Sequence, residues 1–382
     1  MAHWQLDELE SLSAYPRDYR MSQTLYDKCH AVKDVHEYLQ DTYCGSTSVE
    51  FFHIADEKER LWCHEKFEEL AHSTITPDEK IKAWQLLLRT ESMEHFMQKK
   101  FATHKRYSSE GSEAITLALN SLIAEASKFT NEKKLDSVVL GMPHRGRLAT
   151  LVVLNEYPFR NLLYKASGKN DIPEEIVDRV DDIPTHIAVS NTKRFSSGRK
   201  DAKTDKVTLT MIHNPSHLES QNAISMGKTK AKADDLNDPN KLVMNIQCHG
   251  DSAFPGQGAS YEALALSKLP NFSCGGSIHI ITNNQVGFTT EPENYRSFRH
   301  SADLVKPFEV PILRVNTNDT VAVIKACKFA VEYWTKYRKD VLIDMIGYRY
   351  HGHNEVDEPS FTQPQMYAKI RSMDTPPTML KK

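Results

Sequence analysis

The sequence predicts an α/β fold with a mostly parallel β-sheet, covered by helices on both faces and preceded by a helical region. From about residue 105 onward, short apolar and β-branched runs alternate with helical stretches. These runs are continuously apolar, which is typical of parallel strands buried on both faces. The chain has 382 residues, of which 40% are hydrophobic, so it can bury a core of the size that this fold requires.

The first part of the chain is predicted to be helical. A capping box with proline at the first helical position, Thr76-Pro77-Asp78-Glu79, predicts that a helix begins at residue 77. No strand is expected between residues 6 and 101. We therefore expect a helical N-terminal region over residues 1–103 and the α/β domain over residues 104–382.

Six runs in the second part are predicted to be strands, and a long amphipathic helix is expected over residues 320–338, between the last two. Two polar, aperiodic segments, residues 168–206 and 228–241, are expected to be loops. The predicted strands are residues 137–142, 207–213, 242–248, 277–282, 311–316 and 340–348.

Charge and cysteine usage exclude several classes of protein. With 48 basic and 51 acidic residues the net charge is -3, which argues against a nucleic-acid-binding surface. The six cysteines show no zinc-binding spacing and are expected to be reduced thiols. No run reaches the length of a membrane span, and the first residues resemble neither a secretory signal nor a transit peptide.

Polar residues that could bind a metal ion follow two of the predicted strands. Asp251 comes after the strand over residues 242–248, and Asn284 follows the strand over residues 277–282. Because the carboxyl ends of parallel strands lie at one edge of a sheet, these side chains can converge there with the carbonyl of Val286. Such an all-oxygen set suits Mg²⁺, and Gly256 lets backbone N–H groups approach an anion. The alternative interpretation is a turn and a loop without a ligand, and spacing alone leaves both open.

Five motifs give the chain a resemblance to a known family. Together they resemble the thiamine diphosphate-dependent, decarboxylating first component of the 2-oxoglutarate dehydrogenase complex, including its 2-oxoadipate relative. The resemblance implies a thiamine diphosphate-binding fold and oxidative decarboxylation of a 2-oxo diacid. The motifs are "MPHRGRL" (142–148), "NPSHLE" (214–219), "HGDSAFPGQG" (249–258), "NNQVGFTT" (283–290) and "YRYHGHNEVDEPSFTQPQMY" (348–367).

The resemblance also implies roles for individual residues. It makes Asp251, Asn284 and the main-chain oxygen of Val286 the magnesium ligands, and it makes His144 an active-site histidine. The residues implied to contact the cofactor are Arg145, Asp251, Ser252, Asn284, Val286 and His353.

Three further residues match the family less closely. His186 and Ser190 fall where the family has a histidine and a serine facing the substrate, but the flanking residues differ. His217 in "NPSHLE" is a further catalytic candidate. His186 and His217 can equally be structural.

Tyr107 bears on the choice of substrate. Oxoglutarate enzymes usually carry phenylalanine at this position, whereas the oxoadipate relatives carry tyrosine. A phenol adds a hydrogen-bond donor for the distal carboxylate of a longer diacid. We therefore expect a preference for 2-oxoadipate, or use of both acids.

The resemblance implies partners as well. These are a lipoyl-bearing dihydrolipoyl acyltransferase, a dihydrolipoyl dehydrogenase, and a second copy of the chain in a homodimer. The resemblance further implies a location in the mitochondrial matrix. Family members continue into a pyrimidine-binding domain, so the chain is expected to be an N-terminal fragment that is inactive alone. The rival interpretations are a transketolase-like enzyme acting on sugar phosphates and an inactive paralogue that serves as a scaffold.

Overall fold

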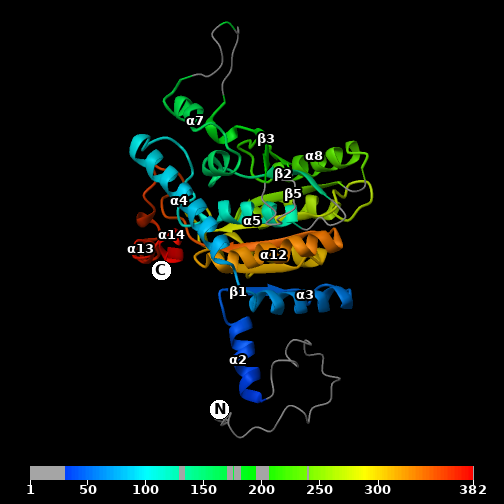
Figure 1. Cartoon of the computed structure of the whole chain (residues 1–382). Helices are drawn as coiled ribbons and strands as arrows, with labels where there is room; N and C mark the ends of the chain where they lie inside the picture. The colour runs from blue at the N-terminus through cyan, green and yellow to red at the C-terminus, as the bar shows by residue number, and fades with distance from the viewer. Residues whose placement is uncertain are drawn as a thin grey trace.

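One eight-stranded mixed sheet forms the centre of the computed structural model, which describes residues 31–128, 134–169, 175, 182–194, 206–238 and 241–381 (Figure 1). The strand order is β1-β7-β8-β6-β5-β2-β4-β3. The pairs β7–β8, β8–β6, β6–β5, β5–β2 and β2–β4 are parallel, and the two edge pairs are antiparallel. The predicted α/β class with a mostly parallel sheet is confirmed.

All six predicted strands are present in the sheet. Their residues are mostly buried on both faces of the sheet, as is typical of parallel strands in an α/β fold, although β5 also buries the polar Asn245, Gln247 and His249. They are β2 (Lys134–Gly141), β4 (Lys206–Met211), β5 (Lys241–Gly250), β6 (Ser277–Asn283), β7 (Ile312–Asn316) and β8 (Val341–Ile346).

Neither of the two edge strands was predicted. The prediction of no strand before residue 101 is wrong for β1 (Thr47–Glu50), which pairs with β7. The prediction of a loop is wrong for β3 (Val189–Arg194), which pairs with β4 and alternates between half-buried and exposed residues. Edge strands pack on fewer neighbours, so their sequences can be short and polar. The prediction of a loop over residues 228–241 is also wrong for the first half of that segment, because α8 (Gln221–Asp235) continues through it. The Lys and Ala residues there favour helix.

Helices cover both faces of the sheet. On one face α5 (Ala114–Lys128) and α12 (Thr320–Tyr337) lie side by side, with α3 (Glu57–Ala71) and α4 (Pro77–Lys100) outside them (Figure 1). On the other face lie α8, α9 (Ala253–Gly256), α10 (Gly258–Leu266) and η5 (Ser301–Phe308). The remaining elements are α2 (Val32–Tyr43), α6 (Arg147–Ala149), η3 (Thr150–Leu154), α7 (Phe159–Ala166), η4 (Pro184–His186), α11 (Pro292–Tyr295), η6 (Pro359–Phe361), α13 (Pro364–Ile370) and α14 (Pro376–Lys381).

The capping box at the start of α4 is confirmed. The backbone N–H of Glu79 donates to Thr76 Oγ1 at 3.2 Å, and the backbone N–H of Thr76 donates to Glu79 Oε2 at 3.0 Å. The predicted helical region from residue 31 onward therefore consists of α2, α3 and α4 around the short strand β1, and residues 1–30 lie outside the described part of the chain.

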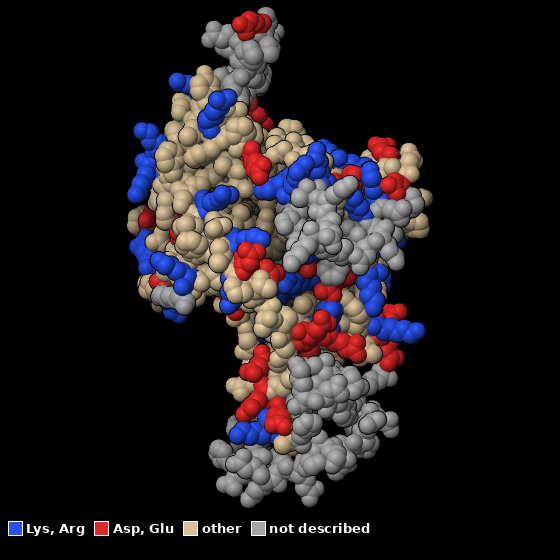
Figure 2. Space-filling model, in the orientation of Figure 1, with Lys and Arg blue, Asp and Glu red and all other residues tan. Residues whose placement is uncertain are grey.

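The surface carries both signs of charge. Figure 2 shows Lys and Arg interspersed with Asp and Glu over the visible face, as the near-balance of 48 basic and 51 acidic residues leads one to expect. Within the described residues, no helix is both long enough and apolar enough to cross a membrane.

Candidate functional site

A polar cavity of about 70 Å³ lies at the carboxyl ends of the central strands. β5 and β6 are parallel neighbours with Gly250 opposite Thr282, so the residues that follow each strand emerge at the same edge. The lining residues include Asp251, Ser252, Asn284 and Val286, together with His144, Arg145 and His353. Seven of the predicted site residues therefore line one cavity.

Asp251 is buried at the floor of this cavity. Its side chain accepts a hydrogen bond from the Tyr295 hydroxyl at 2.5 Å, and its carbonyl accepts one from Ser301 Oγ at 2.6 Å. Arg296 Nη1 donates to the Tyr295 oxygen at 2.7 Å. Burial raises the pKa of Asp251 to about 6, because removing the carboxylate from water disfavours its charged form. A buried carboxylate of this kind is stabilised by a cation.

The loop after β6 is folded tightly around Asn284. Asn284 Oδ1 accepts the backbone N–H of Val286 at 3.2 Å, and Gln285 has a left-handed backbone with φ of 61°. Across the cavity, a Cβ atom added to Gly250 would meet nothing within 4 Å, so the backbone leaves open space there.

Asp251, Asn284 and Val286 therefore line the same small space, and they can offer a carboxylate, an amide oxygen and a main-chain carbonyl. This set of hard oxygen ligands fits Mg²⁺, which completes its shell with water and phosphate oxygens. The described residues contain no group of three or more His, Cys, Asp or Glu side chains that could hold a metal ion. Oxygen donors of the kind that Asp251, Asn284 and Val286 can offer suit Mg²⁺ better than a softer transition metal.

The opposite wall of the cavity is basic. Arg145 donates to the carbonyls of Ser108 and His353 at 3.0 and 2.8 Å. Arg349, 4% exposed, donates to the carbonyls of His351 and Phe288 at 3.2 and 2.9 Å. A guanidinium has five N–H donors, so donors remain for a ligand. The half-buried Arg145 and the buried Arg349 thus donate to carbonyls, and their positive charge suits a phosphate or carboxylate.

Two neutral histidines lie beside these arginines. Burial lowers the pKa of His144 to about 3 and that of His353 to about 4, and the charge of Arg145 adds to both effects. The two rings are 5.4 Å apart between centroids in an edge-to-face arrangement. At neutral pH each imidazole has one donor and one acceptor nitrogen, so each can orient a polar ligand without adding charge.

Tyr107 lies against both histidines. Its ring centroid is 4.2 Å from that of His144 and 5.6 Å from that of His353. The backbone of Tyr107 is left-handed, with φ of 48°. A bulky residue in this conformation is strained and is held in place by its surroundings.

His186, Ser190 and His217 are not among the residues that line the cavity. The His186 imidazole is hydrogen-bonded to Asp182 and Ser216, at 2.9 and 3.1 Å. Ser190 is exposed on the edge strand β3, where its hydroxyl pairs with that of Thr210 at 2.9 Å. The exposed His217 precedes α8, and its neighbour Leu218 lines the cavity instead.

Two site residues were missed by sequence reasoning. Arg349 stands inside the motif "YRYHGHN", so the motif itself was the signal that could have singled it out. Tyr295 ends the short helix α11, and nothing in its local pattern indicates that its hydroxyl reaches back to Asp251. Only the tertiary fold brings those two residues together.

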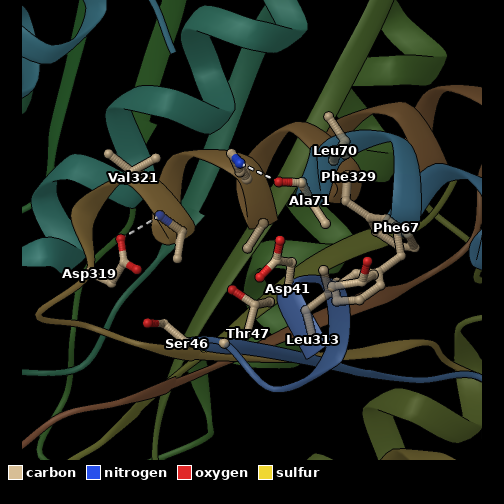
Figure 3. Close-up of a pocket in the computed structure, with 15 residues that line it drawn as sticks. Asp41, Ser46, Thr47, Phe67, Leu70, Ala71, Leu313, Asp319, Val321 and Phe329 are labelled. Carbon is tan, nitrogen blue, oxygen red and sulfur yellow. Dashed lines mark hydrogen bonds between the residues drawn. The ribbon is translucent and has the colours of Figure 1, made fainter. Parts of the chain in front are cut away.

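A second cavity, of about 250 Å³, lies away from this edge, among α2, α3, β7 and the start of α12 (Figure 3). Much of its wall is apolar, as Phe67, Leu70, Leu313 and Phe329 show (Figure 3). Lys325 Nζ donates to the Ala71 carbonyl at the end of α3, at 2.7 Å. This lysine therefore binds the end of a helix. The cavity at the strand ends is the candidate site, because more of its lining residues can bind a charged ligand.

The fold and the site together define an α/β protein with a cavity at the carboxyl edge of a mostly parallel sheet, lined by oxygen donors and guanidinium groups. The family model described as "Dehydrogenase E1 component" matches residues 86–382. The chain belongs to the dehydrogenase E1 component family.

Curated relatives agree with this assignment. A Dictyostelium discoideum protein named "Probable 2-oxoadipate dehydrogenase complex component E1 homolog" is 42% identical over 89% of this chain and 37% of its own length. The Xenopus laevis "2-oxoadipate dehydrogenase complex component E1" is 38% identical over 91% and 37%. The Dictyostelium discoideum "2-oxoglutarate dehydrogenase, mitochondrial" is 38% identical over 89% and 33%. The chain thus spans little more than a third of the length of the relatives that it matches.

Proposed function

We propose that this chain forms the diphosphate- and magnesium-binding half of a 2-oxo acid dehydrogenase E1 active site. The whole protein would oxidatively decarboxylate a 2-oxo diacid and pass the acyl group to the lipoyl arm of a dihydrolipoyl acyltransferase. The observation that carries the proposal is the convergence of Asp251, Asn284 and Val286 with Arg145 and Arg349 around one cavity. An oxygen-only cation site beside two guanidinium groups suits a metal-bound diphosphate.

Each residue then has a physical task. Asp251, Asn284 and the Val286 carbonyl would hold Mg²⁺, and Arg145 and His353 would face the diphosphate oxygens. When bound, thiamine diphosphate supplies the carbanion that attacks the substrate ketone and accepts the electrons released with CO₂. His144, which stays neutral at pH 7, would orient the substrate and hold a proton near it.

The substrate is proposed to be 2-oxoadipate, with 2-oxoglutarate as the second candidate. The Tyr107 ring borders the histidine pair, both members of which line the cavity. Relatives of both names match this chain at similar identity. The tyrosine therefore carries the argument for the longer acid.

Relative kcat/KM for the two acids tests this proposal in the full-length protein that carries this chain. We expect 2-oxoadipate to be preferred, and Tyr107→Phe to shift the ratio toward 2-oxoglutarate by about tenfold, because one hydrogen bond to the distal carboxylate is lost. Tyr261→Phe on the exposed face of α10 is the matched control and should leave the ratio unchanged. A strong preference for 2-oxoglutarate that survives Tyr107→Phe would refute the choice of substrate.

The two rival functions are tested in the same preparation. A transketolase-like enzyme would transfer carbon units between sugar phosphates, which we expect this protein not to do. A scaffold would bind neither Mg²⁺ nor thiamine diphosphate. Turnover of neither 2-oxo acid by protein that binds the cofactor would contradict the proposed activity itself.

The remaining assignments belong to the same proposal. We propose that the protein works with the dihydrolipoyl acyltransferase and dihydrolipoyl dehydrogenase of its complex, as a homodimer in the mitochondrial matrix. The relatives' names support the complex, and one of those names includes the word "mitochondrial". The division at residues 103 and 104 into a helical region and a diphosphate-binding domain is likewise proposed.

A further inference from the structure

A single carboxylate binds the backbone on both sides of Tyr107. The N–H of Arg106 donates to Glu355 Oε2 at 3.0 Å, and the N–H of Ser108 donates to Glu355 Oε1 at 3.2 Å. Between them Tyr107 has its left-handed φ of 48°. N–H groups that converge in this way around a left-handed residue form a nest that binds an anion. Here the anion is a side chain of the protein itself.

Glu355 lies in the same loop as His353, which lines the cavity. Its side chain is 5% exposed and lies 3.7 Å from Arg106 Nε. It follows closely on His353, whose carbonyl accepts from Arg145 and whose ring contacts Tyr107. The carboxylate therefore ties the loop that carries Tyr107 to the loop that carries His353.

The rest of the Tyr107 loop is anchored independently of Glu355. The Arg106 guanidinium pairs with Glu94 and Glu110, both buried. The backbone N–H and the hydroxyl of Ser109 both donate to Glu94 Oε1, at 2.9 Å each. With these contacts intact, loss of the Glu355 carboxylate would act on the conformation of Tyr107 rather than on the attachment of the whole loop.

We propose that Glu355 is a positioning residue, which holds Tyr107 in its left-handed conformation so that the phenol faces the histidine pair where the distal carboxylate of the substrate binds. This inference rests on the proposed function and deepens it, because it explains how a tyrosine at this place becomes a specificity determinant. Without the nest anion, Tyr107 would relax toward an ordinary backbone conformation and its ring would leave His144.

The test uses the full-length protein, assembled with its acyltransferase and dihydrolipoyl dehydrogenase. In Glu355→Gln the amide retains one acceptor oxygen but places an NH₂ group where the second backbone N–H needs an acceptor. We expect KM for 2-oxoadipate to rise about tenfold, kcat to change less than about threefold, and the Kd for Mg²⁺ and thiamine diphosphate to stay within about twofold. Glu355→Ala should raise KM further. Glu358→Gln, in the same loop and exposed, is the control and should match the wild type.

A double-mutant cycle separates positioning from general stabilisation. Once Glu355→Gln has displaced the phenol, adding Tyr107→Phe should change KM no further, so the two effects should not add. Additive effects, an unchanged KM in Glu355→Gln, or a variant that no longer folds would each overturn the inference. Failure of the wild type to turn over either acid would instead count against the proposed function.

Discussion

At the scale of single residues, Glu113 is a carboxyl group with an unusual environment. It is 2% exposed, and its Oε2 has no hydrogen-bond partner. Burial raises its pKa from 4.5 to about 8. The folded protein therefore keeps this proton to higher pH than the unfolded chain does, so the stability linked to it is full below pH 4.5 and is lost as pH rises toward 8.

Replacing Glu113 by glutamine removes that loss. At pH 8.5 we expect the free energy of unfolding of Glu113→Gln to exceed that of the wild type by on the order of a few kcal/mol, so the variant should unfold at a higher denaturant concentration. At pH 4 the two proteins should differ little in stability. Denaturant titrations at the two pH values measure this, with the exposed Glu69→Gln as control. A variant that is no more stable than the wild type at pH 8.5 would show that folding does not raise the pKa of Glu113.

Some site residues could be predicted from the sequence and others could not, for a physical reason. Asp251 and Asn284 follow buried strands directly, so a correct sheet brings them together. Tyr295 and Glu355 act through contacts between distant segments, 44 and about 250 positions apart in the chain. Local patterns carry no information on such contacts. The same limit applies to His186 and His217, whose motifs resemble the family but whose side chains do not line the cavity.

At the scale of elements, Arg147 links three chain segments beside the cavity. Its buried guanidinium donates to the carbonyls of Met142, Ile187 and Ile212, at 2.8, 2.7 and 2.5 Å. These carbonyls follow β2, η4 and β4 respectively. Its guanidinium therefore ties the ends of these three elements together through their backbone carbonyls.

Arg147→Met should therefore destabilise the fold without acting on chemistry directly. Three buried carbonyls would lose their donors, at a cost of about 2 to 4 kcal/mol, since removal of the buried charge offsets part of the loss. Thermal unfolding should show a fall in Tm of several degrees, whereas the exposed Arg371→Met should leave Tm almost unchanged. A Tm for Arg147→Met equal to that of the wild type would contradict this structural role.

The interior elements were predictable and the edges were not. β5 and β6 are buried along nearly their whole length, and their apolar runs, such as Leu242–Met244 and Ile280–Ile281, gave a strand signal despite the polar residues between them. β1 and β3 owe their strand state to pairing with β7 and β4, and their own residues are largely polar. α8 continues past its buried half on charged residues that favour helix, so a search for apolar periodicity ends it too early.

At the scale of the whole molecule, the sheet acts as a frame that collects loops from distant parts of the sequence at one edge. The loops after β2, β5, β6 and β8 all contribute to the same cavity. The lining residues of the cavity include both oxygen donors and guanidinium groups. The account of function depends on this combination, because a metal-bound diphosphate needs both.

Calorimetric titration of Mg²⁺ and thiamine diphosphate into the full-length protein tests that claim most directly. We expect binding that requires both ligands and is weakened at least about hundredfold in Asp251→Asn, because a neutral amide replaces the carboxylate that the cation pairs with. Asp78→Asn on the exposed face of α4 should bind as the wild type does. Equal affinity in Asp251→Asn and the wild type, or no binding by either, would contradict the account.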